Sequence, residues 1–464
     1  MFSKIALCLG VSISLCISAW GQELTDREKK LMSIIESLEK RVTALEEKFS
    51  DEEPLEKGAP SNETPSTAST NTAAPTATPA SAPAPASQPD GNDMRVYWKE
   101  GLRLDSHNGA FKLKFGGRIQ SDWFLFSEGD EIKTEFGDSK NGSEIRRARI
   151  FIGGTIYDDF EFKAQYDFDH DVVSTNDLWI SAKNVPVLGT IKFGHFKEPF
   201  GLERLTSSKD DSFAEEAVAS ALGISRNLGV QVSNSAFDQR LAWAVGVFEE
   251  TLNLDTRTEG NEGISITGRI SGLPLLNEKG DRYLHLGLSA SHRNINEFAK
   301  ASRAETHASN VLAIVSFPET DTVNLLGSEI AYTRGPLHLS GEFNLAFIHS
   351  DRGYDDADLS GFYAQAGYFL TGEHRRYKMG SGFFDKVIPK NNFTWKEGGG
   401  KGAWEVVTRY SHLDLEDNMY TGGELNDISL GLNWYLNPNM RVILNYVHAE
   451  LDDGLLGPGK SDTT

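Results

Sequence analysis

Lysine and arginine occur at alternate positions in several short segments, where their side chains could act together on a negatively charged solute. Lys112, Lys114 and Arg118 share one parity, and Arg147 and Arg149 are separated by a single residue. On an extended strand, two guanidinium groups spaced in this way lie on one face, and their forked donors suit phosphate oxygens. Fixed positive charges along an aqueous path also offset the desolvation cost of an anion. The chemistry that this spacing suggests is the passage of anions.

The same face assignment gives two sets of candidates for an anion pathway. The candidates on strands are Lys112, Lys114, Arg118, Arg147, Arg149, Lys163, Lys183, Lys192 and Lys197. The candidates beside or within a long loop that could fold inward and narrow a pore are Arg204, Lys209 and Arg226. Each charge could instead pair with a carboxylate such as Glu161, Asp167 or Asp169 on the adjacent strand and only hold the wall together. The sequence leaves both interpretations open.

The segments that carry these charges alternate between apolar and polar residues. Phe111, Leu113 and Phe115 share one face, for example, and Lys112 and Lys114 share the other. This period of two predicts β-strands with one apolar and one hydrated face. The predicted strands are 111–124, 145–157, 160–169, 177–184, 190–198, 229–234, 240–248, 264–271, 283–293, 328–334, 337–348, 361–371, 403–412, 427–436 and 440–450.

The spacing between these segments predicts the connections. All eight prolines after residue 93 fall between the predicted strands, which fits because proline cannot donate to a strand ladder. Short turns at 158–159, 334–336 and 437–439 are expected in the periplasm, and 199–228, 294–327 and 349–360 are expected to be external loops. Bacterial single-chain barrels have even strand numbers, so fifteen segments suggest a final strand beyond this sequence, or one within 372–402.

A soluble sandwich would also show alternation, but several predicted strands place two or more charges on the polar face. Strands of about ten residues, a preceding export signal and apolar faces rich in aromatic residues favour an antiparallel all-β membrane barrel of about 16 strands. In such a barrel the apolar faces contact lipid and the polar faces line an aqueous lumen.

The N-terminal part divides into three segments. Residues 1–21 combine Lys4, a short apolar run and small residues before Gln22, as expected of a signal peptide. Residues 22–50 place leucines at intervals of seven, which predicts a short coiled coil or, alternatively, an amphipathic helix lying on the barrel. Residues 51–93 are rich in Pro, Ala, Ser and Thr and should form an extended linker. The predicted barrel occupies 94–464.

The composition excludes several classes of function. With a net charge of −21, the chain should not bind nucleic acid. Both cysteines lie within the signal segment, so the mature chain has no disulfide or thiolate chemistry. No catalytic motif stands out. Asp167, Asp169, His170 and Asp171 resemble a hard-cation cluster, but the preferred interpretation is a strand end and its loop. We therefore expect neither an enzyme, a metal site nor a cofactor. Carboxylates outnumber basic residues within the predicted barrel as well, which leaves the charge of its lumen open.

Several stretches resemble the phosphate-selective porin O and P family of outer-membrane channels. They are Arg146–Arg149 leading to 165–168, 194–203 (GHFKEPFGLE) continuing to 206–209, Arg226–Val230, 402–405 with Arg409–Ser411, and 430–451. The resemblance covers nearly all of 94–464. It implies a trimeric porin of sixteen strands that conducts anions, phosphate or polyphosphate, with a coiled coil before the barrel. Family members usually end in a closing strand with a terminal aromatic residue, which this sequence lacks.

The function expected from the sequence is passive diffusion of small, phosphate-like anions through the bacterial outer membrane. The partners expected are membrane lipid and two further copies in a homotrimer, and the periplasmic coiled coil is a candidate for contact with peptidoglycan. Two alternatives stay open. One is a general or cation-leaning porin, and the other is an exported anchoring or adhesion protein that works through its coiled coil.

Overall fold

The computed structural model describes residues 93–99, 101–168, 173–249, 263–350, 354–452 and 461–464. The predicted signal peptide, the coiled coil and almost all of the linker lie outside these residues. The described part belongs to one compact unit, Ala86–Thr464.

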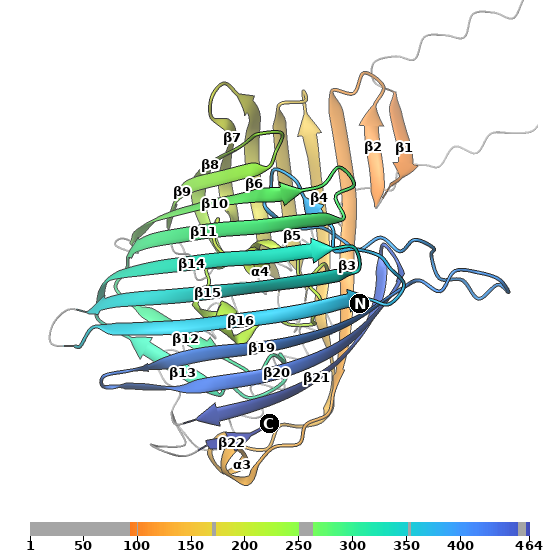
Figure 1. Cartoon of the computed structure of the whole chain (residues 1–464). Coiled ribbons are helices and arrows are strands. Elements are labelled where there is room, and N and C mark those ends of the chain that lie inside the picture. Colours follow the sequence, from red (N-terminus) through yellow and green to blue (C-terminus); the bar gives the residue numbers. More distant parts are fainter. Residues whose placement is uncertain (1–92, 100, 169–172, 250–262, 351–353, 453–460) are drawn as a thin grey trace, which may run out of the picture. The chain divides into compact units, whose positions relative to one another are not determined.

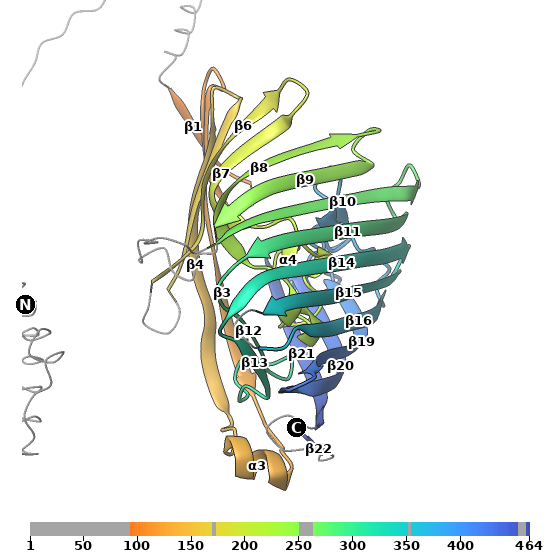
Figure 2. The same cartoon turned by 90° about the vertical axis from the view of Figure 1, so that its left-hand side faces the viewer.

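Fifteen strands form a wall in which each wall strand pairs antiparallel with the next. They are β3 (Phe111–Phe124), β4 (Gly142–Ile156), β5 (Phe160–Asp167), β6 (Ser174–Val185), β7 (Gly189–Lys197), β8 (Arg226–Ala236), β9 (Leu241–Glu249), β10 (Ile264–Leu276), β11 (Arg282–Asn294), β14 (Thr320–Arg334), β15 (Leu337–Ser350), β16 (Ala357–Phe369), β19 (Ala403–Asp417), β20 (Tyr420–Asn437) and β21 (Met440–Asp452). Each predicted segment overlaps one of these strands. Figures 1 and 2 show them following one another around a curved wall.

Both edges of the wall carry short additional strands. A hairpin of β1 (Met94–Trp98) and β2 (Leu102–Ser106) pairs with the beginning of β3, and β22 (Ser461–Thr463) pairs with the end of β21. Within the described ranges, no pairing joins β3 to β21. The wall is thus an open, curved sheet at this seam, and closure of the predicted barrel is not seen.

The two faces of the wall differ in chemistry in the direction that the alternation predicted. Outward side chains are large and apolar, and Ile119, Leu288 and Leu444 are 82%, 63% and 67% exposed. Inward side chains along the middle of the strands are mostly polar or charged and are buried or half-buried. This arrangement reverses that of a soluble sandwich, whose apolar faces are packed inside, and it suits lipid outside and water within.

The remaining elements lie in the connections. The helices are α3 (Asp130–Phe136), α4 (Leu202–Leu205) and the 3-10 turn η1 (Val218–Leu222), and the two-stranded hairpins are β12 (Phe298–Ser302) with β13 (Ala313–Phe317) and β17 (Tyr377–Lys378) with β18 (Phe383–Phe384). In both views α4 lies on the concave side of the wall (Figures 1 and 2). No helix in the described ranges has the length and apolar character needed to cross a membrane.

Three details of the predicted segmentation are wrong. Residues 372–402 contain only the β17–β18 hairpin and no wall strand. Pro274 lies inside β10, where a bulge between Gly272 and Leu275 removes the need for its missing N–H. Wall strands also extend into the predicted external loops, because β14 begins at Thr320 and β16 at Ala357.

The cause of these missed extensions is a change in the inner face near the long loops. Val323 and Leu325 on β14 are fully buried although they face inward. They join an apolar cluster with Phe298 and Phe317 of the β12–β13 hairpin and Leu222 of η1. The outward neighbours Thr322 and Asn324 are polar, so the polarity of the two faces is reversed here and does not continue the pattern of the rest of the strand. This end of the concave side is filled by a protein core.

Candidate functional site: a basic cavity behind the wall

The concave side of the wall borders a cavity of about 2630 Å³. Its lining comes from the inner faces of β3–β10, from β21, and from three inward segments at 197–226, 304–307 and 378–387. At the open seam it also includes outward residues of the two edge strands, such as Ile119 and Leu444. Fifteen lysine or arginine residues line it, compared with nine aspartates and glutamates. The cavity therefore has a basic lining although the whole chain carries a net charge of −21. A lining of one predominant sign concentrates counter-ions inside a cleft.

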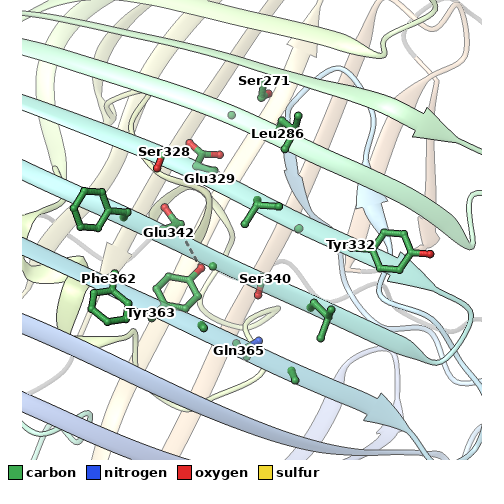
Figure 3. Close-up of a pocket in the computed structure, with 18 of the residues that line it drawn as sticks. Ser271, Leu286, Ser328, Glu329, Tyr332, Ser340, Glu342, Phe362, Tyr363 and Gln365 are labelled. Atoms are coloured by element: carbon green, nitrogen blue, oxygen red, sulfur yellow. Dashed lines mark hydrogen bonds between the residues drawn. The ribbon is translucent and has the colours of Figure 1, made fainter.

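The segment that connects β7 to β8 is attached to the opposite wall by a glutamate. The carboxylate of Glu342 on β15 accepts the backbone N–H of Leu202 at 2.8 Å and that of Glu203 at 2.6 Å. The hydroxyl of Tyr363 on β16 donates to the same carboxylate at 2.8 Å, the bond drawn in Figure 3. These N–H groups belong to the first turn of α4 and have no partner inside that helix, so Glu342 satisfies them. As predicted, this loop folds inward.

Glu342 lies directly across from another inward glutamate, Glu329 on β14. Glu329 is neutralised separately, because Arg269 donates to it through two nitrogens at 2.8 and 2.6 Å and His285 lies 3.1 Å away. Figure 3 shows both glutamates on adjacent strands, beside a hollow of about 1390 Å³ lined mainly by apolar residues. Each buried carboxylate thus has its own set of donors, as burial requires.

Arg409 on β19 links two inward segments. Its guanidinium donates to Glu203 at 3.0 Å and to the carbonyl oxygen of Glu215, both in the β7–β8 connection. It also donates to Glu305 at 3.0 and 2.5 Å, in the segment that holds the β12–β13 hairpin. The Arg409 side chain is 1% exposed. One buried cation therefore holds two segments that are far apart in the sequence.

The β7–β8 connection also reaches the near wall, through Glu215. This carboxylate accepts from Arg146 at 2.7 and 3.1 Å and from Arg147 at 3.3 Å. Burial alone would raise the pKa of Glu215, but the hydrogen bond from Arg146 and the two positive charges lower it below its usual value. The segment thus bridges β4 and β19 across the concave side.

A third inward segment comes from the rim of short turns, between β16 and β19. Arg269 donates to the carbonyl of Gly382 at 2.6 Å, and His285 lies 2.7 Å from the hydroxyl of Tyr377. The backbone N–H of Phe384 contacts Thr206 Oγ1 at 3.4 Å. Inward segments from both rims therefore meet on the concave side, and the aqueous space is restricted to the side of β3–β10 and β21.

Ten of the twelve predicted pathway residues line this cavity. They are Lys114, Arg118, Arg147, Arg149, Lys163, Lys192, Lys197, Arg204, Lys209 and Arg226. Lys112 and Lys183 do not, because they lie near the rim of short turns and pair with Asp158 at 2.8 Å and Glu161 at 2.9 Å. The alternation along each strand correctly predicted that their side chains lie on the polar face. It gives no information about how far along the strand the cavity extends.

Several of the lining cations are held by carboxylates of the wall. Arg149 pairs with Asp167 at 2.5 Å, the wall-pairing alternative that the sequence left open. Asp177 accepts from both Lys163 and Arg226, the latter at 2.7 Å. In the inward segments, Arg204 pairs with Glu216 at 2.7 Å and Lys209 with Asp210 at 3.1 Å.

Other lining cations have no carboxylate within ion-pair distance among the described residues. Arg118 donates to Ser208 Oγ at 2.8 Å and to Gln120. Lys197 donates to the backbone carbonyls of Arg204 and Thr206. Lys192 lies 4.7 Å from the ring centroid of Trp179 and 5.0 Å from that of Phe196. None of the three is held in an ion pair by a carboxylate of the described residues, so each adds a basic group to the lining.

The cavity also contains basic residues that were not among the candidates. Arg146 faces inward beside Arg147 because a bulge in β4 adds one residue opposite Gln120 and Ser121 of β3. Arg441 lies on the inner face of β21. The alternation with the exposed apolar residues Val442 and Leu444 could have predicted this inward position from the sequence. Lys378 lies in the β17–β18 hairpin, for which the sequence contains no alternation.

Comparison with known proteins identifies the family. The family model described as phosphate-selective porin O and P matches residues 113–454. The chain belongs to this porin family. Porin O of Pseudomonas aeruginosa is 28% identical over 404 residues, covering 78% of this chain and 88% of that protein.

Two solved structures resemble this porin at lower similarity. The outer-membrane channel DcaP of Acinetobacter baumannii is 12% identical, with a TM-score of 0.46 and coverage of 77% of this chain and 96% of that one. The anion-selective porin from Comamonas acidovorans is 14% identical, with a TM-score of 0.45 and coverage of 76% and 97%. Family membership makes the chain a porin channel of the bacterial outer membrane, and relatives in the family are channels rather than enzymes.

Proposed function

We propose that this porin allows passive diffusion of small anions of the phosphate or polyphosphate type. The observation that supports this most directly is the excess of lysine and arginine over carboxylates around the cavity. An anion that leaves bulk water loses hydration energy, and basic side chains at fixed positions compensate for that loss. Arg118, Lys192 and Lys197 have the central role in this proposal, because no carboxylate neutralises them. Arg147 and Arg149 act as supporting charges whose partners are Glu215 and Asp167.

The proposal is tested by reversal potentials in planar bilayers under a potassium chloride gradient. We expect wild type to prefer chloride over potassium, and Arg118→Gln to lower that preference. Lys112→Gln is the matched control, because Lys112 is on the same strand but pairs with Asp158 outside the cavity lining. The absence of conductance steps would refute a channel, and a cation-leaning reversal potential would refute anion passage. An equal effect of both substitutions would refute the role of Arg118.

We propose further that one more strand between β3 and β21 closes the wall and brings it to sixteen. Ser461–Thr463 is already paired with β21, and Thr464 and Ala449 exchange two backbone hydrogen bonds of 2.9 Å. On its other side, the Thr463 carbonyl accepts the N–H of Gly129 at 2.8 Å, just beyond the end of β3. A strand that continued this register would pair with β21 and with the part of β3 that β2 leaves unpaired, as burial in lipid requires.

The assembly belongs to the same proposal. We infer a homotrimer in outer-membrane lipid, in which the exported chain places its 22–50 coiled coil in the periplasm, at the reach of peptidoglycan. The heptad pattern of leucines supports self-association of that segment. Crosslinking of the full chain in native outer membranes tests the subunit number. A chain that remains monomeric would refute the trimer.

A further inference from the structure

Three aromatic residues line the cavity together with three lysines, all on the inner face of β3–β7. They are Phe151, Trp179 and Phe196, with Lys114, Lys163 and Lys192. The ammonium groups of Lys114 and Lys163 both lie 5.6 Å from the ring centroid of Phe151. Lys192 lies between the other two rings, at 4.7 and 5.0 Å. We call these six residues the aromatic–lysine strip.

Glycines on neighbouring strands let two of these aromatic residues lie close to the wall. Gly116 is directly across from Phe151, and a Cβ added there would lie 2.5 Å from Phe151 Cε1. Gly194 is directly across from Trp179, and its Cβ would lie 2.7 Å from Trp179 Cα. The ring of Phe151 therefore lies over Gly116, an arrangement that is common between an aromatic residue and a glycine on the adjacent strand. The strip is consequently a surface on the wall and leaves the aqueous space open.

A small inorganic anion would use only the lysines of such a strip. An organic anion with a flat apolar body could use both parts, because its charged group can contact an ammonium while its body packs on a ring. Phe151 and Trp179 are half-buried and accessible from the cavity, whereas Phe196 is 3% exposed and only packs against Lys192. Lys192 has no carboxylate partner among the residues described, and its ammonium group lies beside the ring of Trp179. This combination distinguishes the strip from the other basic residues of the cavity.

We propose that the aromatic–lysine strip binds organic carboxylates that carry an aromatic ring, and that it favours them over small aliphatic carboxylates. This inference rests on the proposed anion channel and names a second substrate class for the same cavity. The competing explanation is that the rings only pack against the lysine stems and hold the ammonium groups in place. In that case an aromatic body on the solute would bring no advantage.

The experiment compares benzoate with acetate, which share a carboxylate and differ in the ring. Binding to the detergent-solubilised full chain is followed by saturation-transfer NMR of the ligand, and block of the chloride current is followed in planar bilayers. A ring contact is worth about a threefold difference in half-saturating concentration. We expect wild type to bind benzoate at least about threefold more tightly than acetate, and to show the same order in current block.

Substitutions of the rings test whether the preference for benzoate comes from the aromatic–lysine strip. Phe151→Leu combined with Trp179→Leu should lower the affinity for benzoate to that for acetate. Trp179→Leu alone should give an intermediate affinity. Phe193→Leu is the matched control, because Phe193 is 55% exposed on the outer face of β7 and does not line the cavity. Lys192→Gln should weaken both ligands together.

Equal affinity of wild type for benzoate and acetate would overturn the inference, and so would a benzoate preference that survives the double substitution. A wild type without chloride current would instead refute the proposed channel. The NMR measurement needs no conduction and would still report on the strip.

Discussion

The inner face of the wall is used in two different ways in its two halves. Along β3–β5, inward residues are mostly half-buried and border the aqueous cavity. Along β11, β14, β15, β19 and β20, inward residues are mostly buried beneath the inward segments. Both halves show the same alternation of polar and apolar residues in the middle of their strands, but only the first half presents its polar residues to solvent.

This difference shows that a polar inner face in a porin wall has two possible roles. In the covered half, Glu342, Glu405 and Arg409 bind backbone groups and side chains of the inward segments. In the open half, Arg118 and Lys192 carry charge into the cavity. Substitutions in the covered half should therefore change the position of the loops, whereas substitutions in the open half should change ion selectivity. Three predictions test this division.

The largest effect is expected for Arg409→Ala. The substitution would leave Glu203 and Glu305 buried without their cation, which costs about 3–5 kcal/mol for broken buried pairs. Both inward segments should then detach, so that single-channel conductance rises and external protease cleaves within 203–217. The control is Lys112→Ala, which removes a cation that pairs with Asp158 outside the cavity lining and should leave conductance nearly unchanged. Unchanged conductance and intact protease protection in Arg409→Ala would show that apolar packing alone holds the segments.

A smaller effect is expected for Glu342→Gln. An amide replaces one of the two oxygens that accept the N–H groups of Leu202 and Glu203 with a donor, and a buried N–H that loses its acceptor costs about 1–3 kcal/mol. Amide hydrogen exchange of these two residues should accelerate accordingly.

The control for Glu342 is Glu161→Gln in the open half. Glu161 pairs with Lys183 at a partly exposed site, where such a pair contributes at most about 1 kcal/mol. Exchange at Leu202 and Glu203 should then equal that of wild type. Equal protection in both variants would contradict the idea that Glu342 anchors the loop.

The smallest effect is expected for Asp211→Asn. Burial and the negative charges of Glu203 and Glu216 raise the pKa of Asp211 well above its usual value, against the opposing charges of Arg375 and Lys197. When the loop is attached to the wall, the Asp211 carboxyl stays protonated at pH values where it ionises in the released loop. The free energy that holds the loop on the wall therefore decreases as pH rises from the ordinary aspartate range towards the raised pKa.

Because asparagine cannot ionise, the variant should strengthen attachment at neutral pH by about 1 kcal/mol and flatten its pH dependence. Amide exchange of residues 206–217, compared with wild type at each pH, measures this. Asp210→Asn, at the neighbouring residue that pairs with Lys209, is the control. A variant with the same pH slope as wild type would show that Asp211 does not control loop attachment.

Particular residues show how far sequence reasoning reaches. Lys114, Arg118 and Lys163 were placed on the inner face correctly, because one residue along a strand turns the side chain to the opposite face. The inner position of Arg146 was missed, since a bulge adds a residue without a clear signal in the sequence. The beginning of β14 was missed for another reason. Val323 and Leu325 face a protein core, so the apolar residues lie on the inner face here and the pattern is reversed relative to the rest of the strand.

The sequence alone determined the antiparallel strands, the two faces of the wall and many of the inward cations, because strand geometry is local and repeats every two residues. The tertiary structure decided which of those cations meet solvent and which of the inward residues hold loops. Arg409 and Glu203 are 206 residues apart and Glu342 and Leu202 are 140 apart. Such contacts depend on the position at which a folded loop packs against the wall. The local spacing of residues in the sequence does not predict that position.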